Sequence, residues 1–83
     1  MMNSGVYRII NIINGHCYIG SAVNLKRRRK EHFSRLRTQN HCNKYLQNAF
    51  NLYKEINFIF DVLEYNPLDL LVIREQFFID SYK

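Results

Sequence analysis

The 83-residue chain lacks several features that would assign it to a particular class of protein. It has only two cysteines, Cys17 and Cys42, which are too few for the disulfide framework of a small secreted domain. No apolar run is long enough to cross a membrane, and no charged stretch followed by an apolar one suggests a signal peptide. No repeat, linker or low-complexity segment indicates a second domain. We therefore expect one intracellular domain over residues 1–83 with a small core.

Acidic side chains are scarce over the first two-thirds of the chain. Residues 1–54 contain ten Lys and Arg residues and only one acid, Glu31, whereas residues 55–83 contain two basic and six acidic residues. The formal charges of the two parts are therefore +9 and −4, and most of the basic residues gather in and just after an unbroken run at positions 26–30. Such a run is typical of a protein that binds a polyanion, most often nucleic acid. Taken alone, a charge run slightly favours the simpler explanation of a solvated helix face.

Turn, cap and periodicity signals predict the order β-β-α-α-β-α. Asn14-Gly15 is a strong hairpin signal, Asn24 is a helix cap, and Asn66-Pro67 places a cap and a first-turn proline before a last helix. The expected strands cover residues 6–11, 16–20 and 58–63, and the expected helices cover residues 25–37, 43–53 and 67 towards 82. We expect an α/β (α+β) domain in which a three-stranded sheet with an N-terminal antiparallel hairpin is flanked by three helices.

Two tyrosines of the expected hairpin point to a site. If the turn has four residues, 12–15, Tyr7 becomes a diagonal neighbour of Tyr18 on one face of the sheet, roughly 7–8 Å away. A strict two-residue turn would set the two side chains farther apart along the strands. Two phenols that converge beside a glycine suggest a functional site, although aromatic strand residues also pack on sheets for structural reasons alone.

The first expected helix carries two residues suited to phosphate chemistry. Arg28 and His32 are four apart and therefore neighbours on one helix face, and the fork of a guanidinium matches phosphate oxygens. Periodicity does not exclude Arg29, and Arg28 is also simply one member of the basic run. His32 facing the sheet is also compatible with a hydrogen-bonded packing role. His41, before the second helix, is by itself typical of a solvated loop histidine or a helix cap.

Glu75 is set among apolar neighbours on the last expected helix. The residues three and four positions away are Leu71, Val72, Phe78 and Ile79. A carboxylate in such surroundings needs a partner, because an unpaired buried charge is very unfavourable. A divalent cation such as Mg²⁺ is one candidate and an arginine is another. A structural ion pair stays equally open, since Arg74 has similar apolar neighbours.

Together these residues resemble the GIY-YIG nuclease domain, in particular that of the homing endonucleases encoded in phage and organelle introns. The resemblance covers essentially the whole chain. It rests on the segments at 5–7 (GVY), 17–22 (CYIGSA), 25–33 (LxxRxxxHF), 45–50 (YLQxAF) and 74–79 (REQFFI), with His41 between the third and fourth. Valine replaces isoleucine at position 6, which leaves Tyr7 in place.

The resemblance implies a three-stranded sheet with three helices and hydrolysis of a DNA phosphodiester with one Mg²⁺ or Mn²⁺ ion per site. It selects Arg28 over Arg29 as the arginine that holds the scissile phosphate, and it makes Glu75 the metal ligand. Tyr7 is then the leading candidate for the general base. A phenol with a pKa near 10 needs nearby cations to lower that value, and we expect Arg28 and the metal to do so.

The remaining roles follow from the same resemblance. Tyr18 is expected to orient the attacking water or to share its proton. His32 and His41 are expected to act as hydrogen-bond donors or proton relays. The expected contacts to double-stranded DNA come from the basic residues Lys26, Arg27, Arg29, Lys30 and Arg35.

Related domains extend past the last helix and are usually followed by a separate DNA-binding region. We therefore expect a fragment, or a minimal gene product, that binds DNA weakly as a monomer. Abundant Asn, Ile, Lys, Tyr and Phe suit an AT-rich phage, organelle or intron gene. A DNA-binding module without catalysis and a repair nuclease relative acting on branched DNA are the alternatives.

Overall fold

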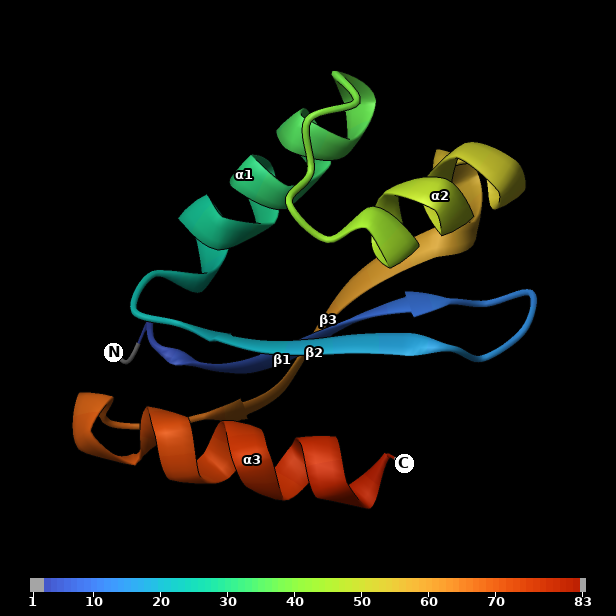
Figure 1. Ribbon diagram of the computed structural model, residues 1–83. Coiled ribbons are helices and arrows are strands. Elements are labelled where there is room, and N and C mark those ends of the chain that lie inside the picture. Colours follow the sequence, from blue (N-terminus) through green and yellow to red (C-terminus); the bar gives the residue numbers. More distant parts are fainter. Residues whose placement is uncertain (1–2, 83) are drawn as a thin grey trace.

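The computed structural model of the protein describes residues 3–82 (Figure 1). The chain forms three strands, β1 (Gly5–Asn11), β2 (Cys17–Ala22) and β3 (Phe58–Tyr65), and three helices, α1 (Leu25–Arg37), α2 (Lys44–Tyr53) and α3 (Leu71–Ser81), in the order β1-β2-α1-α2-β3-α3. Two single 3₁₀ turns, η1 (Glu55–Asn57) and η2 (Leu68–Leu70), precede β3 and α3. The element order confirms the one expected from the sequence. None of the helices over the described residues has the length and apolar character needed to cross a membrane.

The sheet is antiparallel throughout, in the order β2-β1-β3, so β1 is central and β2 is an edge strand. Helices α1 and α2 cover one face, and α3 lies against the other (Figure 1). The main core forms under α1 and α2, where Tyr7 and Ile9 of β1 pack with apolar residues of both helices, among them Phe33, Leu36 and Phe50. This small core holds in place the sheet face that carries the two tyrosines.

The hairpin has the four-residue turn that places the two tyrosines together. Asn11 N–H donates to the His16 carbonyl at 2.9 Å, which leaves residues 12–15 as the turn, and Gly15 takes the left-handed φ of 78° that such a turn requires. In this register Tyr7 pairs with Gly20 and Ile9 pairs with Tyr18. Tyr7 and Tyr18 are therefore diagonal neighbours on one face, as expected.

Asparagine caps begin the first two helices. The Asn24 side chain accepts from Arg27 N–H at 3.0 Å, and the Asn43 side chain accepts from Leu46 N–H at 3.0 Å. The prediction for Asn24 is therefore confirmed. These caps fix where α1 and α2 leave the loops, and α1 is the helix that presents the basic residues.

The expected start of the last helix is wrong. Asn66 does not cap it: its main chain exchanges hydrogen bonds with Ser4, and its side chain donates to Glu64 at 2.8 Å. Pro67 is consequently extended, with ψ of 158°, and α3 begins only at Leu71 after the turn η2. The contact with Ser4, 62 residues away in the chain, overrides the local cap signal.

Candidate active site

Tyr7 is held rigidly above the β1–β2 hairpin. Its side chain is 2% exposed and stacks on Phe60 with a centroid distance of 4.6 Å. Its phenol lies directly over Gly20, where an added Cβ would come within 2.5 Å of the Tyr7 hydroxyl oxygen. Any side chain at position 20 would therefore displace the phenol, which explains why a glycine stands opposite Tyr7 in the strand.

The Tyr7 hydroxyl ends a chain of buried hydrogen bonds through two histidines. Tyr7 Oη lies 2.5 Å from His32 Nε2, and His32 Nδ1 lies 2.8 Å from His41 Nε2. Asn43 N–H donates to His41 Nδ1 at 3.0 Å. His32 and His41 also stack, with centroids 5.0 Å apart. This chain of hydrogen bonds links the loop before α2 to α1, and α1 to the Tyr7 hydroxyl of β1.

These bonds can run in only one direction. A main-chain N–H always donates, so His41 Nδ1 accepts and the proton of His41 sits on Nε2. That proton bonds His32 Nδ1, which leaves the proton of His32 on Nε2, facing Tyr7. Tyr7 Oη therefore accepts from His32, and the phenol's own proton is left for another acceptor.

The histidines are neutral, as this direction requires. Burial, followed by the charges of His41 and Arg28, lowers the pKa of His32 to about 4. Burial also lowers the pKa of His41, although its bond with Asn43 acts against the shift. Both rings therefore carry one proton near neutral pH, and His32 serves as a donor to Tyr7.

The pKa of Tyr7 is raised in the protein without a bound metal. Arg28 lowers it, as expected, but burial and the neighbouring Tyr18 raise it more, so the net shift is upward. The expectation of a lowered phenol pKa includes the charge of a bound metal, and Arg28 alone does not offset the burial of Tyr7 in the core that positions it. The Tyr7 phenol stays protonated at neutral pH in the absence of a further positive charge.

Tyr18 stands beside the histidines on the same face of the sheet. Its half-buried ring meets His32 and His41 edge-on, with centroid distances of 5.5 and 6.3 Å. Burial is the largest cause of its raised pKa, and Arg28 again acts in the opposite direction. Tyr18 thus completes a cluster of two phenols and two imidazoles.

Arg28 faces this cluster from α1, one turn before His32. It is half-buried, whereas Arg29 is exposed, and its charge acts on the pKa values of Tyr7, Tyr18 and His32 alike. The structure therefore favours Arg28 over Arg29 as the cation of the cluster. No hydrogen bond or ion pair within residues 3–82 occupies the Arg28 guanidinium, so it can accept an external anion.

Glu75 approaches from α3, around the edge strand β2. Ser21, which points to the α3 face, donates its hydroxyl hydrogen bond to Glu75 Oε1. The charge of Glu75 raises the pKa of both Tyr7 and Tyr18, so the carboxylate lies within electrostatic reach of the phenols. Arg74 does not pair with Glu75 but makes a two-bond pair with Glu64, at 2.6 and 2.8 Å.

The Glu75 carboxylate fits one hard cation. Its Oε2 has no hydrogen bond within the described part of the chain, and no group of three or more metal-ligating side chains occurs there. Mg²⁺ and Mn²⁺ bind through one or two carboxylates while keeping several waters, so a single oriented carboxylate beside a phosphate site suits them. Ser21 would fix the orientation of that ligand.

Two residues that support the candidate site, Gln47 and Ser21, could hardly be predicted from the sequence. Gln47, buried in α2, accepts from His41 N–H at 3.2 Å and donates to the Leu36 carbonyl at 3.0 Å, which ties the histidine loop to α1. Its place on the apolar face of α2 was the only available hint. For Ser21 the sequence offers no comparable hint, because a strand serine next to a glycine is unremarkable by itself.

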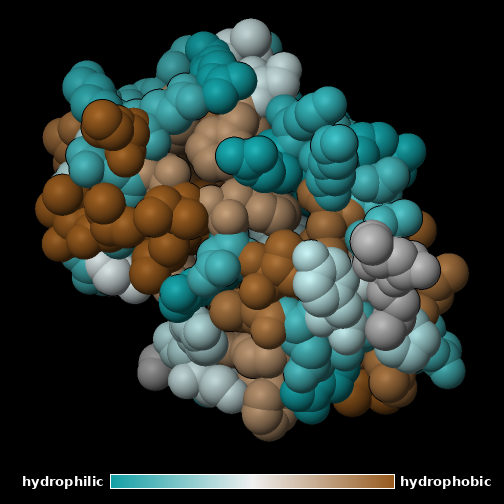
Figure 2. Space-filling view, turned by 180° about the vertical axis from the view of Figure 1, so that it is seen from behind, coloured by the Kyte–Doolittle hydropathy of each residue, from teal (hydrophilic) through white to brown (hydrophobic). Residues whose placement is uncertain are grey.

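The five residues expected to bind DNA are all exposed on α1: Lys26, Arg27, Arg29, Lys30 and Arg35. Arg27 and Arg35 lie 3.8 and 3.7 Å from Glu31, which are exposed ion pairs of little strength. Figure 2 shows hydrophilic side chains gathered over the upper right of the molecule, where α1 lies in that view. A basic surface thus borders the Tyr7–Arg28 cluster.

Comparisons with known proteins identify the family of the chain. The model of the GIY-YIG catalytic domain matches residues 3–83. Intron-associated endonuclease 1 of Enterobacteria phage T4 is 39% identical over 80 residues; these cover 94% of the chain but 32% of that protein, so the chain spans about a third of this relative.

Solved structures give the same result. The catalytic domain of homing endonuclease I-TevI superposes with a TM-score of 0.90 at 36% identity, over 95% of this chain and 87% of that one. An E75A mutant of that catalytic domain gives a TM-score of 0.89 at 36% identity, over 98% and 84%. The resemblance drawn from the motifs is therefore confirmed, and the chain belongs to the GIY-YIG catalytic domain family.

Proposed function

We propose that this domain is a Mg²⁺- or Mn²⁺-dependent endonuclease that hydrolyses a phosphodiester of double-stranded DNA, as part of a homing endonuclease encoded by a phage or intron gene. The observation that carries the proposal is the gathering of Tyr7, Tyr18, Arg28 and Glu75 around the β2 edge. The name and source of the phage T4 relative support the same substrate class and origin.

The groups of the cluster divide the work of hydrolysis. The Arg28 guanidinium binds the scissile phosphate and stabilises the charge that develops on it. Tyr7 first releases its own proton to solvent, His32 donates a hydrogen bond to the resulting phenolate oxygen, and the phenolate then takes the proton of the attacking water. Tyr18 orients the water beside it. A cation held by Glu75, when bound, would supply Lewis-acid stabilisation of the phosphate and the leaving oxygen.

The histidine pair acts by fixing the direction of the bond to Tyr7. His41 is locked by Asn43 N–H, so it cannot take a proton from His32 without losing that bond. The pair therefore stabilises negative charge on Tyr7 and does not carry its proton away. This assigns His32 the role of a donor to the base and His41 the role of a positioning residue.

Plasmid cleavage tests the proposal. The chain is incubated with supercoiled plasmid in Mg²⁺ or Mn²⁺, alongside the variants Glu75→Gln and Arg28→Ala, with Lys44→Ala, an exposed cation of α2, as the control. We expect nicking or linearisation by the parent and by Lys44→Ala only. Equal cutting by the parent and by both site variants would refute the assignment. Salt-sensitive DNA binding without cleavage in any variant would favour a binding module.

The affinity for DNA is expected to be low. The exposed basic residues of α1 make sequence-independent phosphate contacts, and most target affinity is expected from a separate DNA-binding region elsewhere in the full-length protein. A competition experiment between a target-bearing duplex and a random duplex should give a ratio near one for this chain. A preference for branched DNA over plain duplex would favour the repair-nuclease alternative.

A further inference from the structure

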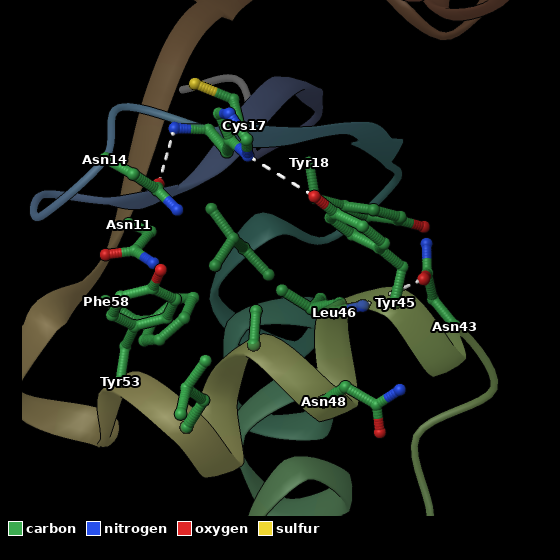
Figure 3. A pocket seen from close by; sticks show the side chains of 14 residues that line it. Asn11, Asn14, Cys17, Tyr18, Asn43, Tyr45, Leu46, Asn48, Tyr53 and Phe58 are labelled. Carbon is green, nitrogen blue, oxygen red and sulfur yellow. Dashed lines mark hydrogen bonds between the residues drawn. The ribbon is translucent and has the colours of Figure 1, made fainter.

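A cavity of about 380 Å³ lies between the far half of the β1–β2 hairpin and α2 (Figure 3). Buried apolar side chains of both elements, such as Ile9 and Leu46, form its floor, and exposed residues such as Tyr45 and Asn48 stand at its rim. Tyr45 Oη lies 3.4 Å from His16 Nδ1, which joins α2 to the hairpin across one side of the opening. The active-site cluster does not use this space.

The cavity contains a buried donor without a partner. Asn11 is 2% exposed, and its Oδ1 accepts from Ile13 N–H at 3.0 Å. Its Nδ2 has no hydrogen-bond partner among residues 3–82. Figure 3 shows Asn11 at one end of the cavity, with Phe58 and Tyr53 beside it. Because Asn11 closes this end of the cavity, its side-chain amide is a sensitive reporter of what occupies the space.

The lining selects an uncharged, flat ligand. No Lys, Arg, Asp or Glu lines the cavity. Four aromatic rings face it, from Tyr18, Tyr45, Tyr53 and Phe58, and so do four asparagine side chains, Asn11, Asn14, Asn43 and Asn48. Aromatic rings bind unstacked bases through their faces, and asparagine amides match the hydrogen-bonding edges of bases.

The cavity adjoins the phosphate site through two shared residues. The Tyr18 ring packs against His32 and His41 and also lines the cavity. Asn43 bonds His41 through its main chain and lines the cavity as well. A group bound in the cavity is therefore separated from the catalytic cluster by little more than the Tyr18 ring.

We propose that this cavity binds the unpaired base of a nucleotide next to the scissile phosphate, with the base packed on the aromatic rings of the lining. The identity of the ligand rests on the proposed function, since a base is what a nucleic-acid substrate places beside its phosphate. Base capture requires unstacking, which is easiest at mismatched or single-stranded positions. The domain should therefore cut duplexes with a mismatch at the cut site faster than perfect ones.

Nucleotides that differ only in the base test the proposal. Full-length chain labelled with ¹⁵N is titrated with deoxyadenosine monophosphate, thymidine monophosphate and 2-deoxyribose 5-phosphate, without metal, and followed by NMR. We expect the two nucleotides to shift the Asn11 side-chain amide signals and the Ala49 main-chain signal. The base-free sugar phosphate should need at least about tenfold higher concentration for the same shifts, because base stacking on the rings is lost.

A filled cavity provides the matched comparison. Ala49, half-buried in the wall, is replaced by Phe, and Ile56, 86% exposed and outside the lining, is replaced by Phe as the control. Ala49→Phe should abolish the base-dependent shifts, and Ile56→Phe should keep them. Should Ala49→Phe fail to fold, the comparison of nucleotides with sugar phosphate on the parent chain decides alone.

Two results would overturn the proposal: equal shifts by all three compounds, which would assign the response to phosphate, or no shift at Asn11, which would leave the cavity to water. Metal-dependent plasmid cleavage is measured separately. Failure of plasmid cleavage would refute the proposed endonuclease activity. It would not affect the titrations, which test binding of the base alone.

Discussion

The sheet face under α1 and α2 and the face against α3 differ in the polar groups that they hold. Under α1 and α2, Tyr7, His32 and His41 are neutral and buried in one directed chain of hydrogen bonds, and the half-buried Tyr18 packs edge-on against both imidazoles. Against α3, the polar groups are charged and half-exposed: Arg8 pairs with Asp61 at 3.0 Å and Arg74 with Glu64, while Glu75 bonds Ser21. The directed chain of neutral groups and the charged pairs thus lie on opposite faces of the sheet, and Arg28 of α1 adds one positive charge beside the neutral chain.

The first test removes the hydroxyl at the end of the neutral chain. Tyr7→Phe should lower the rate of cleavage by about 10²- to 10⁴-fold, because the proposed general base is lost. Raising the Mn²⁺ concentration should not restore the rate, since the proposed metal ligand, Glu75, is intact. The parent rate should also rise with pH between 7 and 9, because the raised pKa keeps Tyr7 protonated at neutral pH. Tyr65→Phe, on an exposed strand end, is the control.

Acid should lower the free energy of unfolding, first through protonation of the buried His32. The folded pKa of His32 is about 4 against 6.5 when unfolded, so the unfolded chain binds the proton more tightly. Stability should therefore fall as the pH drops from 6.5 to 4, by about 3 kcal/mol for a shift of this size. Urea unfolding at several pH values measures it. His16→Gln, at the exposed hairpin end, should leave the dependence in place, and an unchanged free energy of unfolding down to pH 4 would contradict the prediction.

A smaller effect is expected when the support of the metal ligand is removed. Ser21→Ala should weaken the apparent affinity for Mn²⁺ by about 10- to 100-fold, because Glu75 loses the donor that orients it. Unlike the Tyr7 variant, it should regain most of its rate at high Mn²⁺. Cleavage as a function of Mn²⁺ concentration distinguishes the two, with the exposed Ser34→Ala as control. An unchanged affinity would show that Ser21 does not orient Glu75.

The smallest effect is expected at the charged pairs of the α3 face. Arg74 and Asn66 bond the Glu64 carboxylate and hold its pKa at about 2, below the ordinary 4.5. This stabilisation is present above pH 4.5 and is lost as the pH falls towards 2. Glu64→Gln should remove that part of the acid dependence and lower the free energy of unfolding at pH 7 by the same amount, which is small because the pair is exposed to solvent. A marked loss of stability at neutral pH would show that the pair is more important than its exposure suggests.

Local signals in the sequence determine the parts of the fold that were predicted well. Asn14-Gly15 and Asn24 act within a few residues of themselves, and the strand register then follows from the turn length. The start of α3 was mispredicted because Asn66 is engaged by Ser4 at the other end of the chain. No local rule contains a contact of that kind.

The site divides in the same way. Arg28 and Glu75 could be selected because motifs of a known family mark them, although helical spacing alone left Arg29 and an ion pair open. The bond between His32 and His41, the support from Gln47 and the raised pKa of Tyr7 all depend on burial by residues distant in the chain. Their physical causes arise only once the helices have packed.

The direction of the hydrogen bonds through His41 and His32 is set by a main-chain amide hydrogen, which every amino acid except proline has. Asn43 contributes its main-chain amide hydrogen, so replacing its side chain alters the cap of α2 but not the identity of the donor. Proline is the one standard residue that would delete it. The direction of the hydrogen bonds that end at Tyr7 is therefore set by the path of the backbone. Nearly all point mutations at position 43 leave that direction unchanged.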